Sequence, residues 1–74
     1  MRFKTLECVV AERDIAEHGL CRGDLGAVVE VYEPDGLEVE FAAASGETRL
    51  VLTLTVRDVR KVGPADVLAV RSTV

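Results

Sequence analysis

The residues best suited to chemistry in this sequence are one histidine and two cysteines. His18 stands three residues before Cys21, with Glu17 beside it, and Cys8 lies nearer the N-terminus. A cysteine nucleophile needs a base within hydrogen-bonding reach and a third group that orients this base. An enzyme built on a His18–Cys21 pair is therefore one interpretation. The simpler one makes His18 a surface loop residue beside the turn residue Gly19, and we predict no catalytic residue.

Metal and phosphate sites have weaker support from the spacing of these residues. A structural zinc site takes four ligands from recognisably paired positions, whereas His18 and Cys21 form a single short-spaced pair. Gly19, Gly23 and Gly26 follow the pattern G-x-x-x-G-x-x-G, without the Lys and Ser/Thr of a phosphate-binding loop. We therefore predict that the protein binds no metal and no cofactor.

The size and charge of the chain set further limits on function. Its 74 residues suit one domain, and a composition of 49% apolar and 30% charged residues is typical of a folded globule. The net charge of −4 argues against nucleic acid as a partner, because phosphates favour basic surfaces. No run reaches the roughly 18 apolar residues of a membrane span, and Glu7 interrupts any signal peptide. We expect a cytoplasmic protein, away from membranes, in which Cys8 and Cys21 are thiols.

The apolar pattern that must position these residues is that of short strands. Apolar and polar residues alternate over three segments, which predicts strands with one buried side, and two shorter β-branched runs predict a first and a last strand. The inward side of the first strand stays open between Cys8 with Val10 and Val9 with Ala11. The predicted strands are residues 6–11, 25–32, 37–42, 49–54 and 59–62.

Two turns determine how the three longer strands pair. The first reads Glu-Pro-Asp-Gly at 33–36, where proline presets its own φ and glycine accepts a left-handed conformation, and the second lies at 44–47. All predicted pairs fall on one face, which Leu25, Ala27, Val29 and Val31 share. Five short strands with one apolar side predict a small barrel. The predicted cross-strand partners are Val31 with Val39, Val29 with Phe41, Val39 with Leu52, and Phe41 with Leu50.

The connection between the first two strands, residues 14–24, is rich in glycine. Three glycines within eight residues indicate positive φ angles or very close packing of the backbone. We expect Asp24 to accept hydrogen bonds from nearby backbone N–H groups and hold the turn. Ile15 and Leu20 are expected to tuck under this connection and plug one end of the core.

The outer face of the predicted sheet is acidic. The predicted register places Glu30 directly across from Glu40, although facing like charges are unfavourable. Positions that break a local rule are sometimes functional. One hypothesis is therefore that Glu30, Tyr32, Glu38 and Glu40 form an acidic binding face with an aromatic anchor for a basic partner. The alternative is an ordinary solvated face.

The run from Glu17 to Tyr32, EHGLCRGDLGAVVEVY, resembles the signature of a small bacterial family of unknown function. The resemblance continues through LEVEF at 37–41 and LVLTL at 50–54, and it covers residues 6–62. Its GDLGAVV segment is also loosely similar to the opening of SH3-like barrels such as KOW modules and the nitrile hydratase β-subunit. The resemblance implies an SH3-like fold and no particular function.

We therefore expect an all-β chain with a five-stranded SH3-like barrel at 1–62 and a C-terminal extension at 63–74. The extension carries apolar residues and either is disordered or docks on the barrel, a second copy or a partner. The function that we expect is a non-catalytic protein-binding accessory module, such as an antitoxin, an immunity-type protein or a small enzyme subunit. Homo-oligomerisation through the extension is compatible with this role.

The alternative is a KOW-like module that binds RNA or a ribonucleoprotein. It would use a basic cluster at Arg57, Arg60 and Lys61, with Arg13 and Arg22 nearby. An ordinary explanation of the cluster is a solvated strand edge, because charges at an edge prevent aggregation. Affinity for RNA would fall steeply with salt concentration.

Overall fold

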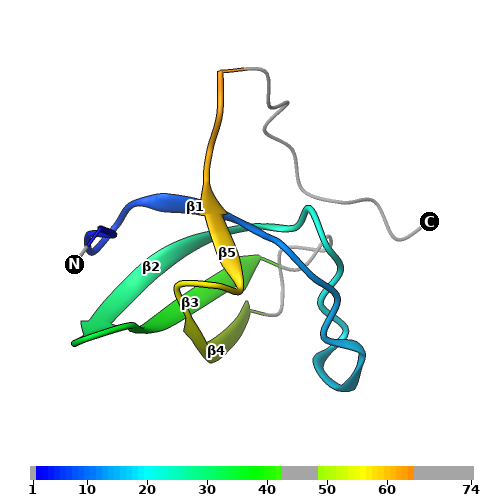
Figure 1. Cartoon of the computed structure of the whole chain (residues 1–74). Coiled ribbons are helices and arrows are strands. Elements are labelled where there is room, and N and C mark those ends of the chain that lie inside the picture. The colour runs from blue at the N-terminus through cyan, green and yellow to red at the C-terminus, as the bar shows by residue number, and fades with distance from the viewer. Residues whose placement is uncertain (1, 43–48, 65–74) are drawn as a thin grey trace.

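The computed structural model describes residues 2–42 and 49–64, which form five antiparallel strands in one sheet (Figure 1). The order of the strands across the sheet is β4-β3-β2-β1-β5. One short 3-10 helix, η1, lies between β1 and β2. The predicted all-β class with five strands is confirmed, and the predicted extension lies outside the described residues from 65 onward. The elements are β1 (Cys8–Ala11), η1 (Ala16–His18), β2 (Leu25–Tyr32), β3 (Gly36–Ala42), β4 (Arg49–Thr55) and β5 (Val59–Lys61).

The short link between β4 and β5 forces the sheet to curl. These two strands are the opposite edges of the sheet, which a flat arrangement would hold about 19 Å apart, at four spacings of about 4.8 Å. The chain from Thr55 to Val59 spans at most about 14 Å, at about 3.6 Å per residue. The two edges therefore bend toward each other, as a barrel requires, and the sheet in Figure 1 is visibly bent.

The inward side of β3 and β4 forms the centre of the core, as predicted. Leu37 and Val39 are fully buried, and Phe41 is nearly so. The ladder pairs Val39 with Leu52 and Phe41 with Leu50, which confirms the predicted register of these two strands. Because cross-strand partners share a face, these side chains pack together under the sheet.

The predicted register between β2 and β3 is wrong. Val39 pairs with Val28 rather than Val31, and Phe41 pairs with Gly26 rather than Val29. The ladder shifts between Val28 and Glu30, where Val29 forms a β-bulge. An extra residue in one strand exchanges the inward and outward positions on either side of it.

The bulge corrects which side chains of β2 face the core. Leu25, Ala27 and Val29 were predicted to point inward, but Val29 is 40% exposed and Val28 is completely buried. Beyond the bulge the prediction holds, because Val31 packs against the core.

Gly26 explains why β2 needs this shift. A Cβ atom at Gly26 would lie 2.8 Å from ring atoms of Phe41 and 2.8 Å from Cγ1 of Val39, closer than carbon atoms pack. The inward position opposite Phe41 therefore accepts glycine alone. Adding Val29 as a bulge keeps Val31 on the inward side further along the same strand.

The first strand begins later than predicted and buries an aromatic residue before it. Leu6 has a positive φ of 74° and an 81% exposed side chain, so regular β1 starts at Cys8. Val9 and Ala11 face the core, which settles the open alternative for this strand. Phe3 is also buried in the core cluster, although the sequence pattern assigned it no place there.

The connection between β1 and β2 closes one end of the core as expected. Ile15 and Leu20 form an isolated β-bridge around η1, and both side chains are buried. Asp24 accepts a 2.9 Å hydrogen bond from the backbone N–H of Cys21, as predicted. Two of the three glycines, Gly19 and Gly23, have positive φ. No helix in the described part of the chain is long and apolar enough to span a membrane.

Candidate functional site

The structure places the four predicted binding residues on the outer side of β2 and β3. We call Glu30, Tyr32, Glu38 and Glu40 the acidic face. Glu30 and Tyr32 lie on the exposed half of β2 beyond the bulge, and Tyr32 is 46% exposed. Glu38 and Glu40 alternate on β3 with the buried Leu37, Val39 and Phe41, which directs both glutamates outward.

The like-charge pair on this face exists, but its members differ from those predicted. Glu30 lies opposite Glu38, whereas Glu40 lies opposite Ala27. The turn sets this pair, because Tyr32 lies opposite Gly36 and the ladder runs regularly from there to Glu30 and Glu38. The bulge at Val29 lies beyond the pair and brings Glu40 opposite Ala27. Facing carboxylates in a strand pair cost roughly 0.2–1 kcal/mol.

Tyr32 is held against this pair by a hydrogen bond. Its hydroxyl donates to Oε1 of Glu38 over 3.1 Å. The pKa of Tyr32 is raised above 10.0 mainly because this hydrogen bond holds the phenolic proton, while partial desolvation and the charges of Glu38 and Glu30 act in the same direction. The ring is therefore an oriented aromatic surface beside two carboxylates.

Exposed apolar side chains border the acidic face. Val51 is 48% exposed and lies opposite Glu40, and Thr53 lies opposite Glu38 in the same ladder. Val29 is exposed next to Glu30. Val29 and Val51 were not predicted from the sequence to belong to this surface. The glycine inside the strand at Gly26 is the signal that could have revealed the bulge and the exposure of Val29.

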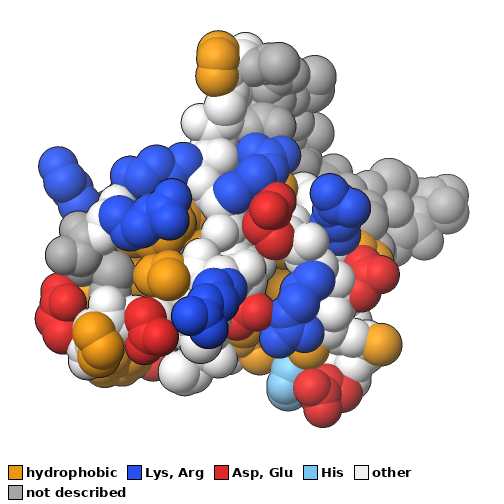
Figure 2. Space-filling model, in the orientation of Figure 1, with side chains coloured by type: hydrophobic (Ala, Val, Ile, Leu, Met, Phe, Trp, Pro, Cys, Tyr) orange, Lys and Arg blue, Asp and Glu red, His pale blue; other side chains and the backbone are white. Residues whose placement is uncertain are grey.

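The predicted basic cluster consists largely of ion-paired side chains. Figure 2 shows lysine and arginine side chains spread over one face, with acidic side chains between them. Arg60 Nε lies 3.2 Å from Oε1 of Glu12, and Lys61 Nζ lies 3.0 Å from Oε2 of Glu7. Lys61 also stands over the ring of Phe3, 5.3 Å from its centroid. These pairs agree with the interpretation of a solvated strand edge.

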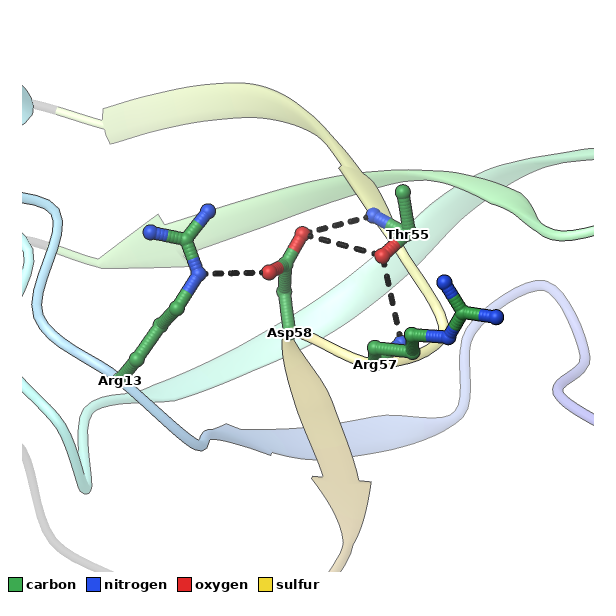
Figure 3. Close-up of polar contacts among 4 residues, drawn as sticks. All are labelled: Arg13, Thr55, Arg57 and Asp58. Atoms are coloured by element: carbon green, nitrogen blue, oxygen red, sulfur yellow. Dashed lines mark hydrogen bonds and ion pairs between the residues drawn. The ribbon is translucent and has the colours of Figure 1, made fainter.

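One carboxylate ties the turn before β5 to the chain after β1 (Figure 3). Oδ1 of Asp58 accepts from Nε of Arg13 at 2.6 Å, and Oδ2 accepts from the backbone N–H of Thr55 at 2.9 Å. Partial burial by itself would raise the pKa of Asp58. The bonds from Thr55 and Arg13 outweigh burial and hold the pKa below its usual range. Asp58 is therefore a structural residue of the turn, and the sequence analysis gave it no such role.

The residues first considered for catalysis and metal binding do not share one site. His18 lines an open pocket of about 200 Å³ together with Arg13, Glu17, Thr53 and Asp58. Cys21 is not among the residues that line it, and its backbone N–H is held by Asp24. Cys8 is exposed on β1. Among residues 2–42 and 49–64, no group of three His, Cys, Asp or Glu residues is placed to hold a metal ion.

Comparison with known proteins identifies the family of this chain. No curated protein and no solved structure matches the chain. The family described as a domain of unknown function (DUF4926) matches residues 5–61, a segment that contains all five strands and the acidic face. The chain therefore belongs to the DUF4926 family.

Proposed function

We propose that this domain is a non-catalytic protein-binding accessory module that recognises a basic partner through the acidic face. An antitoxin, an immunity-type protein or a small subunit of an enzyme would each fit this description. The observation that carries the proposal is the facing pair Glu30–Glu38 with the ring of Tyr32 hydrogen-bonded beside it.

The electrostatics of this group favour a cationic ligand. A lysine or arginine side chain placed between Glu30 and Glu38 would replace repulsion by two attractive contacts. Tyr32 offers an aromatic face for the same cation and an apolar surface that can be desolvated. Exposed Val29 and Val51 extend the contact area beyond the charges.

The fold and the cysteines support an accessory role of this kind. The strand order and the curl imposed by the link from Thr55 to Val59 support the SH3-like barrel as the scaffold. Cys8 and Cys21 are free thiols in the structure, which suits a reducing cytoplasm. The same proposal includes a contact with a second copy through the apolar residues of 63–74.

A KOW-like RNA-binding module is the second candidate. The lysine and arginine side chains spread over the face in Figure 2 favour it. Against it, Arg13, Arg60 and Lys61 are each paired with a carboxylate, which lowers the positive potential that a phosphate backbone would meet.

A pull-down from native cell extract, with and without nuclease, tests the proposal. We expect a stoichiometric protein partner that resists nuclease and is lost from Glu30→Lys and from Glu40→Lys. The matched control is Glu12→Lys, which makes the same charge change at an exposed residue after β1, outside the acidic face and outside the pocket that His18 lines. RNA or ribosomal proteins that nuclease releases would instead establish the KOW-like role. Equal capture by all four proteins would refute the acidic face.

A further inference from the structure

The two edges of the sheet differ in how they are protected. The β5 edge is three residues long and includes Arg60 and Lys61, and charged side chains on an edge discourage pairing with another strand. The β4 edge is seven residues long, and after Arg49 at its start it contains neither a charged residue nor a proline. A long edge with so little charge is a ready template for an added strand.

The hydrogen-bond phase of β4 shows which backbone groups point outward at this edge. The backbone N–H of Val56 donates to the carbonyl of Asp35 over 3.0 Å, which makes these residues a hydrogen-bonded pair. Such pairs alternate along an antiparallel ladder, and this ladder runs without a shift. The residues that bond toward β3 are therefore Leu50, Leu52 and Leu54, and those directed away from β3 are Val51, Thr53 and Thr55.

Among residues 2–42 and 49–64, two of the three outward-directed residues find no partner for their outward backbone groups. The N–H of Thr55 donates to Asp58 Oδ2 at 2.9 Å, and its carbonyl accepts from the N–H of Asp58 at 2.9 Å. No such partner bonds the outward N–H and carbonyl of Val51 or Thr53 within the part of the chain that the structure describes. These four groups match the pattern that an antiparallel strand would satisfy.

The space beside this edge is open. The pocket of about 200 Å³ is bounded on one side by Leu52, Thr53 and Leu54 and on the other by residues of the β1–β2 connection, including Glu17 and His18. The residues that the structure describes therefore leave space beside Thr53.

The charges beside the edge indicate the chemistry of the missing strand. On the outer face, Val51 lies next to Glu40, and Thr53 lies next to Glu38. A strand added to β4 would run about 10 Å from β3, two strand spacings away. Long basic side chains on that strand would extend over the short Val51 and Thr53 toward the two glutamates.

We propose that β4 accepts an extended segment of a partner protein as an additional strand, with Lys or Arg at alternate positions on its outer side. The inference rests on the proposed function, for which it supplies the binding mode. A second copy of this chain complements the surface less well, because its own β4 offers one basic residue, Arg49, where the proposed strand offers Lys or Arg at every alternate position.

The experiment uses the full chain and a defined probe, a capped octapeptide of alternating lysine and valine. We expect saturable binding at low salt in a ¹⁵N NMR titration, with amide hydrogen exchange at Val51 and Thr53 slowed at least tenfold. The octapeptide of alternating glutamate and valine is the control and is expected not to bind. Thr53→Pro removes an outward N–H without removing a bond to β3, so it is expected to fold and to bind at least tenfold more weakly. Thr53→Val is expected to bind as the natural chain does.

The outcomes separate this inference from the proposed function. One outcome would overturn strand addition and leave the acidic face intact. In it, Glu40→Lys weakens peptide binding, but Thr53→Pro binds as tightly as the natural chain and hydrogen exchange at Val51 and Thr53 is not slowed. If Thr53→Pro abolishes peptide binding and Glu40→Lys does not change it, β4 is the binding edge. The basic character of the occupant and the role of the acidic face would then be overturned. No binding of the lysine peptide would overturn strand addition, while the pull-down still judges the proposed function. A dimer of the free chain, with Val51 and Thr53 amides protected, would show that a second copy is the occupant and overturn the inference.

Discussion

Glu30 and Glu38 face each other across the β2–β3 ladder, and the hydroxyl of Tyr32 donates to Glu38 at 3.1 Å. Two carboxylates and one aromatic ring therefore meet on the exposed side of a hairpin whose other side is the core. The hairpin turn creates this meeting, because Tyr32 lies opposite Gly36 and the ladder runs without a shift from there to Glu30 and Glu38. An unfavourable charge pair of this kind is expected at a binding site, because a bound cation would relieve the repulsion.

Neutralising one member of the pair should stabilise the free domain. Glu30→Gln removes the repulsion but retains an oxygen that can accept the N–H of Val31, as Oε1 of Glu30 does now at 3.2 Å. We expect the free energy of unfolding in urea to rise by about 0.2–1 kcal/mol. Glu17→Gln serves as the control and should leave stability unchanged. A loss of stability in Glu30→Gln would show that the pair is not repulsive.

The titration of Tyr32 can be read directly. The chain has one tyrosine and no tryptophan, so phenolate absorbance at alkaline pH reports this residue alone. We expect a midpoint above 10.0, because Glu38 holds the phenolic proton. Glu38→Gln should lower the midpoint, and Glu17→Gln should not. An unchanged midpoint in Glu38→Gln would exclude the carboxylate of Glu38 as the cause.

The fit of Gly26 against Phe41 predicts a large cost for a single methyl group. Gly26→Ala places a carbon 2.8 Å from the ring, so the core must shift, and overpacking of this kind costs about 1–3 kcal/mol. Chemical denaturation measures the loss. In a Phe41→Leu background, where the ring is absent, Gly26→Ala should cost less stability than it does in the natural chain. An equal cost in both backgrounds would contradict direct contact between Gly26 and Phe41.

Proline substitutions test the hydrogen-bond phase of β4. Thr53→Pro should cost little, because the N–H of Thr53 points away from β3 and proline is tolerated at such edge positions. Leu52→Pro should be less stable than Leu52→Ala by about 1–3 kcal/mol, because it also removes a ladder bond and leaves the acceptor on β3 without its donor. Thermal unfolding of the three variants measures the difference. A Thr53→Pro variant as unstable as Leu52→Pro would mean that the N–H of Thr53 also bonds to β3.

The ion pair of Asp58 predicts how stability depends on acid. Its pKa in the folded state is lowered, so its contribution is present above the unfolded value near 3.8 and is lost as pH falls through the lower folded value. The stability difference between the natural chain and Asp58→Asn should therefore be constant near neutral pH and shrink below about pH 4. Urea unfolding from pH 7 to pH 2.5 measures this difference. A difference that grows on acidification would contradict the lowered pKa.

Much of the fold follows from local sequence patterns. Alternating residues such as Leu37, Val39 and Phe41 predict a strand with one buried side, and the turn before β4 predicts the pairing of Phe41 with Leu50. Asp24 holds its turn through a bond to a residue three positions away, which sequence proximity makes predictable. The membership of Glu30, Tyr32, Glu38 and Glu40 in one outer face was predictable for the same reason.

The tertiary structure alone decided how these residues face one another. Val28 and Val29 are equally apolar, so alternation cannot determine which of them points inward. The ring of Phe41 decides this, because only Gly26 leaves room for it. The exact residues of the turn, with Tyr32 opposite Gly36, place Glu30 opposite Glu38. The burial of Phe3 and the bond from Arg13 to Asp58 likewise join residues far apart in the chain. Such contacts depend on the volumes and charges that the curled sheet brings together, and no local sequence pattern encodes them.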